Sequence, residues 1–322
     1  MLKYGLIAIS AILPRFVKGL TLSKDSKAIA VSSRSLNKAQ KFADEHNLEY
    51  YYDDYHQLLL NQEIDIVYIS STNKTHHQIA KDALMANKHV ILEKPFTVTY
   101  QEALELVSLA KEKDLFLMEG QKVVFLPTTM KIKELIKEGV LGDLEYIYLP
   151  ASANYGFSPD SWMNDYYEAG GALMGSGSYA LSFVSFITDS SIIEAQCLEN
   201  HEKGKADHLT SLSFKTESGV ICNAILGGKI NTVNRCYIYG SNGHIYLDNY
   251  WKSRAITLEL KGQKPQIFDF PYESEFTFYI DHISDLFKDN KIESDIMPHY
   301  LSLEAMFYLD HFHQLYQGNL DK

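Results

Sequence analysis

The sequence predicts a two-domain α/β protein, and three observations point to that class. The chain has 322 residues, whereas a single domain usually contains roughly 100 to 200. Its first third alternates short apolar or β-branched runs with helical patterns, which is typical of a parallel sheet built from βαβ units. Beyond about residue 122 the runs become longer and are separated by glycine-containing turns, which indicates a mostly antiparallel sheet. We therefore expect domains at 1–122 and 123–322.

The spacing of apolar residues predicts the individual elements. Strands in the first third are expected at Tyr4–Ile9, Ala28–Ser33, Ile64–Ser70 and His89–Leu92. Helices, with apolar residues three and four positions apart, are expected at Asn37–His46, His76–Asn87 and Thr99–Lys113. Strands in the second half are expected at Leu209–Thr216, Val220–Leu226, Arg235–Tyr239 and Ile256–Leu260. The segment Phe278–Leu315 predicts two helices interrupted near Pro298.

Composition argues against several classes of protein. The formal net charge of -11 makes nucleic acid or an anionic membrane surface an unexpected partner, because either would repel the chain. No apolar run approaches the roughly 20 residues of a membrane span. The cysteines are too few and too far apart for a disulfide framework or a zinc site; they are Cys197, Cys222 and Cys236. We expect a cytoplasmic protein that binds a small molecule and no metal.

The loop after the first predicted strand stands where a dinucleotide-binding domain carries a glycine-rich turn. Glycines there let the backbone turn sharply and approach the pyrophosphate at a helix N-terminus. Aligned on GxGxxG, Ala8 and Ser10 occupy the first two glycine positions and Leu13 the third. Small side chains permit close approach where φ is negative, so nucleotide contacts are expected from Ala8, Ser10, Ala11 and Ile12. Taken alone, these residues equally fit a packed loop without a ligand.

The end of the second predicted strand bears on the choice of nucleotide. Ser33 and Arg34 stand where an NAD-specific domain often carries an acidic residue for the ribose hydroxyls. A guanidinium can stack on adenine and donate hydrogen bonds to a 2′-phosphate, and Lys38 follows one helical turn later. The pattern favours NADP over NAD. The alternative is a solvated, basic start of a helix.

Motifs in a fixed order along nearly the whole chain resemble the Gfo/Idh/MocA oxidoreductase family. The central one is Glu93-Lys94-Pro95, directly after the strand that ends at Leu92. The others are Ser33-Arg34, Ser71-Thr72-Asn73 followed by His76, Phe125-Leu126-Pro127, Gly139-Val140-Leu141-Gly142, Gly170-Gly171-Ala172-Leu173, Gly240-Ser241-Asn242-Gly243-His244-Ile245 and Trp251-Lys252. Tyr179 stands where many members carry histidine, and this resembles the dihydrodiol-dehydrogenase-like branch.

The resemblance implies a Rossmann dinucleotide-binding domain at 1–122. It implies a substrate-binding and oligomerisation α/β domain at 123–322, whose open, mostly antiparallel sheet often forms a homodimer or a higher homo-oligomer. Further cofactor contacts are then expected from Ser71, Thr72, Asn73, His76, Glu93 and Lys94. The implied activity is NAD(P)-dependent hydride transfer to or from a small hydroxy or carbonyl compound, such as a sugar or polyol.

Lys94 and Tyr179 are the expected catalytic residues, and both are expected to contact the substrate. Hydride transfer at a carbon that bears oxygen needs a cation or proton donor near that oxygen, and Lys94 can supply it. A phenol such as Tyr179 can exchange the hydroxyl proton where a nearby cation stabilises the phenolate. Glu93 would orient the lysine or contact the nicotinamide ribose. Trp162 would form a wall of the substrate site by stacking, or serve ordinary packing.

The motif that contains Tyr179 departs from the family at one position. An aspartate usually precedes Gly-x-Tyr or Gly-x-His, and Gly175 stands there instead. A carboxylate that would hold the substrate or orient the acid-base residue is therefore missing. With Ala8 and Ser10, this leaves a second hypothesis beside the favoured oxidoreductase: a non-catalytic ligand-binding or regulatory protein on the same fold. A third is an enzyme whose tightly held cofactor is recycled in place.

Overall fold

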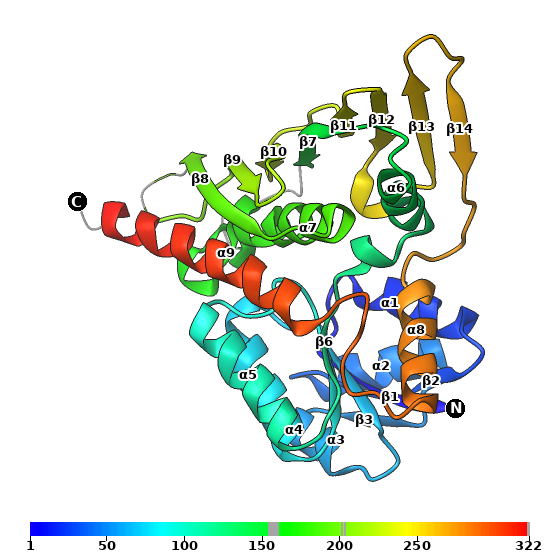
Figure 1. Ribbon diagram of the computed structural model, residues 1–322. Coiled ribbons are helices and arrows are strands. Elements are labelled where there is room, and N and C mark those ends of the chain that lie inside the picture. The colour runs from blue at the N-terminus through cyan, green and yellow to red at the C-terminus, as the bar shows by residue number, and fades with distance from the viewer. Residues whose placement is uncertain (154–160, 201, 203, 321–322) are drawn as a thin grey trace. The chain divides into compact units, whose positions relative to one another are not determined.

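The computed structural model describes residues 1–153, 161–200, 202 and 204–320 (Figure 1). These residues form two compact units. The first unit comprises Met1–Lys122 and Glu273–His299, and the second comprises Val123–Tyr272 and Tyr300–Lys322. Within the described residues, no helix has the length and hydropathy needed to cross a membrane.

The first unit is built on a six-stranded parallel sheet with the order β3-β2-β1-β4-β5-β6. Its strands are β1 (Leu2–Ile7), β2 (Ser26–Ser32), β3 (Tyr50–Tyr52), β4 (Ile66–Ile69), β5 (His89–Leu92) and β6 (Leu117–Glu119). The chain runs outward from β1 to β3 and then returns to β4, beside β1. Loops at the carboxyl ends of strands flanking such a reversal are where ligands bind in open α/β sheets. The predicted parallel sheet is confirmed.

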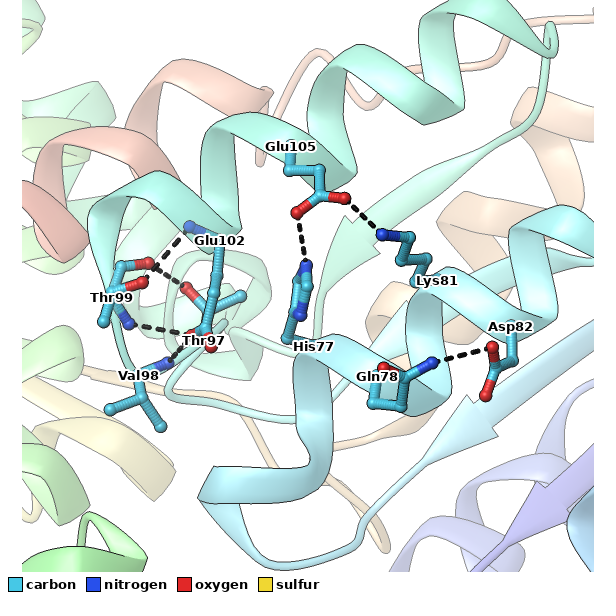
Figure 2. Close-up of polar contacts among 9 residues, drawn as sticks. All are labelled: His77, Gln78, Lys81, Asp82, Thr97, Val98, Thr99, Glu102 and Glu105. Carbon is cyan, nitrogen blue, oxygen red and sulfur yellow. Dashed lines mark hydrogen bonds and ion pairs between the residues drawn. The ribbon is translucent and has the colours of Figure 1, made fainter.

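Helices join the strands of this sheet. They are α1 (Leu13–Leu22), α2 (Leu36–His46), α3 (Tyr55–Leu60), α4 (His76–Met85), α5 (Tyr100–Glu112) and α8 (Thr277–Lys288), with the short helix η1 (Asn73–Thr75) before α4. A capping box fixes the start of α5: Glu102 N donates to Thr99 Oγ1 at 3.2 Å, and Glu102 Oε2 accepts from Thr99 N at 3.0 Å. Figure 2 shows this cap, which ends the loop that follows β5.

A polar clamp joins α4 to α5 beside that cap. Glu105 on α5 faces His77 Nε2 at 2.9 Å and accepts from Lys81 Nζ at 2.6 Å, both on α4 (Figure 2). The loop between β5 and α5 is therefore held at both ends, by the strand and by a helix that is fixed to its neighbour.

The segment Glu273–His299 packs with the first unit, which differs from the expected domain at 123–322. Its helix α8 lies against α1: the ring of Phe276 meets that of Phe16 edge-on at 6.1 Å, and a Cβ built on Gly19 would lie 2.6 Å from Phe276 Cβ. Ser26 and Ser284 share a buried 2.7 Å hydrogen bond. The apolar pattern of α8 shows that one face is buried, but it does not show against which partner.

The second unit is built on an eight-stranded sheet with the order β14-β13-β12-β11-β7-β10-β9-β8. Its strands are β7 (Leu144–Ser152), β8 (Ile192–Asn200), β9 (Leu209–Thr216), β10 (Ile221–Gly227), β11 (Arg235–Gly240), β12 (Gly243–Asp248), β13 (Ala255–Leu260) and β14 (Gln266–Asp269). β7 and β10 pair in parallel, whereas the other neighbours pair antiparallel. The predicted mostly antiparallel sheet is confirmed.

Helix α7 (Gly171–Thr188) lies against β9 and β10 of this sheet, and α6 (Pro127–Lys137) packs on α7. The long helix α9 (His299–Leu320) follows α8, as the interruption near Pro298 predicted. Short helices precede α7 and β13: η3 (Trp162–Asn164), η4 (Tyr166–Glu168) and η5 (Tyr250–Lys252), while η2 (Lys122–Phe125) follows β6. The buried carboxylate of Asp207 accepts from Ala172 N at 3.1 Å and Leu173 N at 2.9 Å, and thereby caps α7.

Candidate active site

The first unit brings the predicted nucleotide-binding residues to one edge of its sheet. Residues 8–12 follow β1, Ser33 and Arg34 follow β2, residues 71–76 follow β4, and residues 93–94 follow β5. Because all these strands are parallel and adjacent, their carboxyl ends lie at the same edge. The residues that the sequence assigns to one ligand are therefore neighbours in this unit.

The loop after β1 adopts a turn that glycine normally supplies. Ala8 has φ 71°, in the left-handed region that an alanine Cβ disfavours, so the negative φ on which its role was predicted is wrong. Hydrogen bonds hold this conformation: Ser10 Oγ donates to Ser70 Oγ at 2.9 Å, and Ser70 Oγ donates to Ala8 O at 3.2 Å. Helix α1 starts directly afterwards, with Ile12 at its N-cap and no side-chain cap.

We predict that Ala8→Gly raises the free energy of unfolding by about 1 kcal/mol. The left-handed alanine stores about 1–2 kcal/mol, of which the greater freedom of glycine in the unfolded chain offsets a part. Urea unfolding measures the change. Ala11→Gly is the matched control, because Ala11 lies in the same loop but not at positive φ, and it is expected to destabilise. Equal effects of the two substitutions would show that Ala8 is not strained.

Arg34 and Lys38 are exposed cations at the end of β2 and the start of α2. Neither side chain has a hydrogen bond, ion pair or ring contact with any other residue that the structure describes. Ser33 is half-buried, and its N–H donates to Tyr52 O at 3.1 Å, which ties the end of β2 to β3. The cations therefore project from a fixed strand end and are available to an anionic group.

A buried histidine contacts the loop that follows β4. Thr75 Oγ1 donates to Ser71 Oγ and is also 2.8 Å from Thr72 O, while Asn73 is buried at the start of η1. His76 is 1% exposed, with Nδ1 2.9 Å from Pro95 O and Nε2 3.2 Å from Ser71 O. The imidazole thus spans the loops that follow β4 and β5. Since both ring nitrogens face backbone carbonyls, we infer that His76 positions these loops.

Burial lowers the pKa of His76 to about 4, although hydrogen bonds to the carbonyls of Pro95 and Ser71 favour the protonated ring and oppose this shift. The unfolded chain, with a pKa near 6.5, therefore binds this proton first as the pH falls. We predict that the free energy of unfolding decreases between about pH 6.5 and pH 4, with a His76 contribution on the order of 3 kcal/mol.

Stability measured at several pH values tests this prediction. His76→Gln is expected to flatten the decrease, and His311→Gln, which removes an exposed histidine, is expected to leave it unchanged. The same slope in His76→Gln as in the wild type would contradict the assignment. His313 also contributes to the decrease in the free energy of unfolding of the wild type, because burial lowers its pKa to about 4 as well.

Glu93 is a buried carboxylate at the end of β5, and it is 7% exposed. Its Oε1 accepts from Tyr68 OH at 2.6 Å, and its Oε2 accepts from the backbone N–H of Lys94 at 3.3 Å. Gly120, which directly follows β6, packs against this carboxylate: a Cβ at that position would lie 3.1 Å from Glu93 Oε1. Burial raises the pKa of Glu93, while Tyr68 and the ammonium groups of Lys94 and Lys122 lower it.

Lys94 is half-buried beside this carboxylate. Burial lowers the pKa of Lys94, and the negative charges of Glu93 and Glu119 oppose that shift. A lysine with a lowered pKa releases its proton more readily, while the neighbouring carboxylates favour its charged form. The side chain can therefore act as a cation or as a proton donor at the edge of the sheet where the loops predicted to bind the nucleotide lie.

A second group of buried charges, which lies at and after the end of β6, was not predicted from the sequence. Glu119 is 1% exposed and Lys122 is 3% exposed. Lys122 Nζ lies 3.9 Å from Glu275 Oε1, the same oxygen that accepts from Arg15 of α1. The sequence could have pointed to Glu119 and Lys122, because these charged residues lie at the end of an apolar strand, as Glu93 and Lys94 do. No local signal pointed to Glu275, which the packing of α8 brings there.

Tyr179 and Trp162 belong to the second unit. Tyr179 lies in the middle of α7 and is 9% exposed, and Gly175 precedes it by one helical turn, on the same face. Trp162 begins η3 and is 37% exposed. An aromatic side chain that is this exposed is available for contact with a ligand. Within the described residues, no cluster of three or more histidine, cysteine, aspartate or glutamate side chains could hold a metal ion.

Two family models match the chain. Residues 2–121 match the Gfo/Idh/MocA model described as an oxidoreductase family with an NAD-binding Rossmann fold, and residues 129–246 match the Gfo/Idh/MocA C-terminal domain. Trans-1,2-dihydrobenzene-1,2-diol dehydrogenase of Mus musculus is 26% identical over 309 residues, which are 92% of this chain and 91% of that protein. The protein of the same name from Homo sapiens is 30% identical over 215 residues, 66% of this chain and 64% of that protein.

Solved structures share the fold across nearly the whole chain. Aldose-aldose oxidoreductase from Caulobacter crescentus, complexed with glycerol, superposes with a TM-score of 0.89 at 20% identity, over 99% of this chain and 98% of that one. The 3-ketoreductase KijD10 from Actinomadura kijaniata, in complex with NADP and TDP-benzene, superposes with a TM-score of 0.84 at 21% identity, over 96% of each chain.

Proposed function

The chain belongs to the Gfo/Idh/MocA oxidoreductase family, in its dihydrodiol-dehydrogenase-like branch, and from this premise we propose that it transfers a hydride between NADP and a small hydroxy or carbonyl compound such as a sugar or polyol. The observation that carries the proposal is Lys94, half-buried against the carboxylate of Glu93 at the end of β5. Relatives named as dehydrogenases and oxidoreductases support the reaction class.

The residues present fit a dinucleotide. Ala8 already has the positive φ that the sharp turn requires, although it is not glycine. Ser10 turns its hydroxyl to Ser70. The backbone of residues 8–12 would hold the pyrophosphate, and residues 71–73 and Glu93 the nicotinamide half. When bound, the nicotinamide would supply or accept the hydride.

Arg34 and Lys38 support a preference for NADP over NAD. The 2′-phosphate of NADP is an anion, and a guanidinium can donate two hydrogen bonds to it. Both side chains are exposed and lie where the strand end leads into α2. The complex of the 3-ketoreductase KijD10 with NADP is consistent with this choice.

In this proposal Tyr179 transfers the proton, and Lys94 supplies a positive charge. During oxidation of an alcohol, the Tyr179 phenolate takes the hydroxyl proton while the carbon gives up its hydride. The Lys94 ammonium stabilises the negative charge on the substrate oxygen. In the reverse direction Tyr179 returns the proton to the carbonyl oxygen. Trp162 offers an aromatic surface to the substrate.

A spectrophotometric screen tests the function. Sugars, polyols and cyclic diols are offered with NADP⁺, and the corresponding carbonyl compounds with NADPH. We expect turnover of at least one compound, faster with the NADP pair than with the NAD pair. If a sugar binds equally well with and without nucleotide, and no compound is turned over, the chain is instead a non-catalytic binding protein.

We further infer a homo-oligomer formed through the open face of the eight-stranded sheet. Tyr146 and Tyr148 on β7 lie opposite Tyr239 and Tyr237 on β11, and they alternate with buried residues that face the helices. Tyr239 is 37% exposed. Sedimentation analysis is expected to give a dimer or larger assembly, which Tyr239→Asp weakens. A monomeric wild type at micromolar concentration would overturn the inference.

A further inference from the structure

Asp207 is a buried carboxylate of the second unit that was not predicted as a site residue, and it is 6% exposed. Its Oδ2 accepts from the backbone N–H groups of Ala172 at 3.1 Å and Leu173 at 2.9 Å, and from the hydroxyl of Thr210. Its backbone carbonyl also accepts from Ala172 N, at 3.0 Å. A negative charge is favourable at the N-terminus of a helix. Side chain and backbone of one residue therefore hold the start of α7.

Two glycines let the start of α7 lie this close to its neighbours. Gly171 has φ 100°, and a Cβ built on it would overlap Asp207 Oδ1. A Cβ built on Gly170 would lie 2.5 Å from Met163 O and 2.6 Å from Trp162 O, both in η3. Any larger residue at either position would force these segments apart. Helix α7 thus begins between Asp207 on one side and the backbone of η3 on the other.

The segment that contains Asp207 is also bonded directly to η3. Ala206 N donates to Asn164 O at 3.1 Å, and both residues are buried. Gly170 N donates to Asp165 O at 3.0 Å, which fixes the turn that leads from η3 to α7. Each of the three segments is therefore held by the other two. We call this arrangement of η3, Asp207 and the start of α7 the Asp207 junction.

The two substrate residues proposed in the second unit both extend from the Asp207 junction. Trp162 is the first residue of η3, and Tyr179 follows Leu173 in α7 by less than two helical turns. A shift at the start of α7 would therefore move the phenol of Tyr179 away from the ring of Trp162. A displacement of about 1 Å in a reacting group can lower the rate on the order of 100-fold.

We propose that Asp207 is a positioning residue, which fixes Trp162 and Tyr179 relative to each other through the backbone of η3 and the start of α7. This inference rests on the proposed function, since Trp162 and Tyr179 have their roles from it. The junction belongs to the second unit, whereas the residues proposed to bind the nucleotide belong to the first. The positioning role therefore predicts a loss of turnover without a loss of nucleotide affinity.

Asp207→Asn tests the role of the carboxylate. The side chain keeps its size but loses its charge, and only one of its two terminal atoms can still accept a hydrogen bond. We expect kcat for a compound found in the spectrophotometric screen to fall about 10- to 100-fold. The Kd for NADPH is expected to stay within about two-fold of the wild type. A residue that only stabilised the fold would lower the midpoint of thermal unfolding and leave the kcat of the folded enzyme unchanged.

The fluorescence of Trp162 gives a readout that does not depend on turnover. The chain has two tryptophans, so Trp251→Phe leaves Trp162 as the only one. Time-resolved anisotropy then measures the fast local motion of its ring. We expect Asp207→Asn to increase the amplitude of that motion about two-fold in this background, because the backbone that carries Trp162 loses one of its supports.

Asp54→Asn is the matched control, because Asp54 also caps a helix: its Oδ1 accepts from His56 N at 2.9 Å at the start of α3. It is expected to lower the midpoint of thermal unfolding by a few degrees and to keep the kcat of the wild type. Thr210→Val is the milder second variant, since it removes one donor to the same oxygen and keeps the carboxylate. It is expected to lower kcat about two- to five-fold and decides the question if Asp207→Asn does not fold.

Unchanged kcat in the folded Asp207→Asn variant would overturn the inference. A loss of kcat without added motion of Trp162, or added motion without a loss of kcat, would overturn it as well. If the wild type turns over no compound, hydride transfer is rejected, and the motion of Trp162 alone decides whether Asp207 holds that side chain in place.

Discussion

Replacement of Lys94 by methionine is expected to lower kcat/KM about a thousand-fold, while the Kd for NADPH stays within about three-fold of the wild type. Methionine keeps most of the apolar stem of lysine but removes the charge that we propose stabilises the substrate oxygen. Burial lowers the pKa of Lys94, whereas Glu93 and Glu119 favour its charged form. In such a partly buried place, the attraction between the ammonium and a negatively charged oxygen is stronger than in water. The control is Lys111→Met, the same substitution at an exposed position of α5, which is expected to keep full activity.

Tyr179→Phe adds a test of joint action. If Lys94 and Tyr179 act on the same oxygen of the substrate, as proposed, removing the second after the first costs little more. The double variant is then expected to be no more than about ten-fold slower than the slower single variant. Losses that multiply would assign the residues to independent tasks. Full turnover in both single variants would refute the chemistry assigned to them.

Arg34→Ala is expected to raise the Kd for NADPH by about 10- to 100-fold, because charge-assisted hydrogen bonds to a phosphate contribute roughly 1.5–3 kcal/mol. The Kd for NADH, which lacks the 2′-phosphate, is expected to stay within about three-fold. Titration calorimetry with both nucleotides measures the difference. Lys38→Ala is expected to have a smaller effect in the same direction, since an ammonium cannot form the bidentate contact.

An unchanged Kd for NADPH in Arg34→Ala would mean that Arg34 is only the solvated start of α2. The substitution disturbs little else, because the side chain makes no hydrogen bond, ion pair or ring contact with other described residues. A loss of affinity for both nucleotides alike would instead indicate stacking on the adenine, which both share.

Elements with a strong apolar pattern were predictable from the sequence. The strands His89–Leu92 and Leu209–Thr216 have the predicted bounds, because a buried run and a regular alternation are both unambiguous. Helix α1 was not predicted; it carries Pro14 in its first turn and Gly19 near its end, which obscure the pattern. The attachment of Glu273–His299 to the first unit depends on which apolar faces fit, and no local pattern encodes that.

The candidate site was predictable only in part, for a similar reason. The motif at Glu93 and Lys94 follows a buried strand directly, where two charged residues in a row are conspicuous. The positive φ of Ala8 was not predictable, since alanine rarely adopts it; the bond from Ser70 that accompanies it joins residues 62 apart in sequence. The contact between Tyr68 and Glu93 likewise depends on the pairing of β4 with β5.

A calorimetric titration of the purified, nucleotide-free protein with NADPH and with NADH tests most directly whether the first unit binds the nucleotide. We expect micromolar binding of NADPH and weaker binding of NADH, because the turn at Ala8 is formed and Arg34 is available. Absence of binding by either nucleotide would contradict this expectation, and would make this chain a ligand-binding or regulatory protein on an oxidoreductase fold.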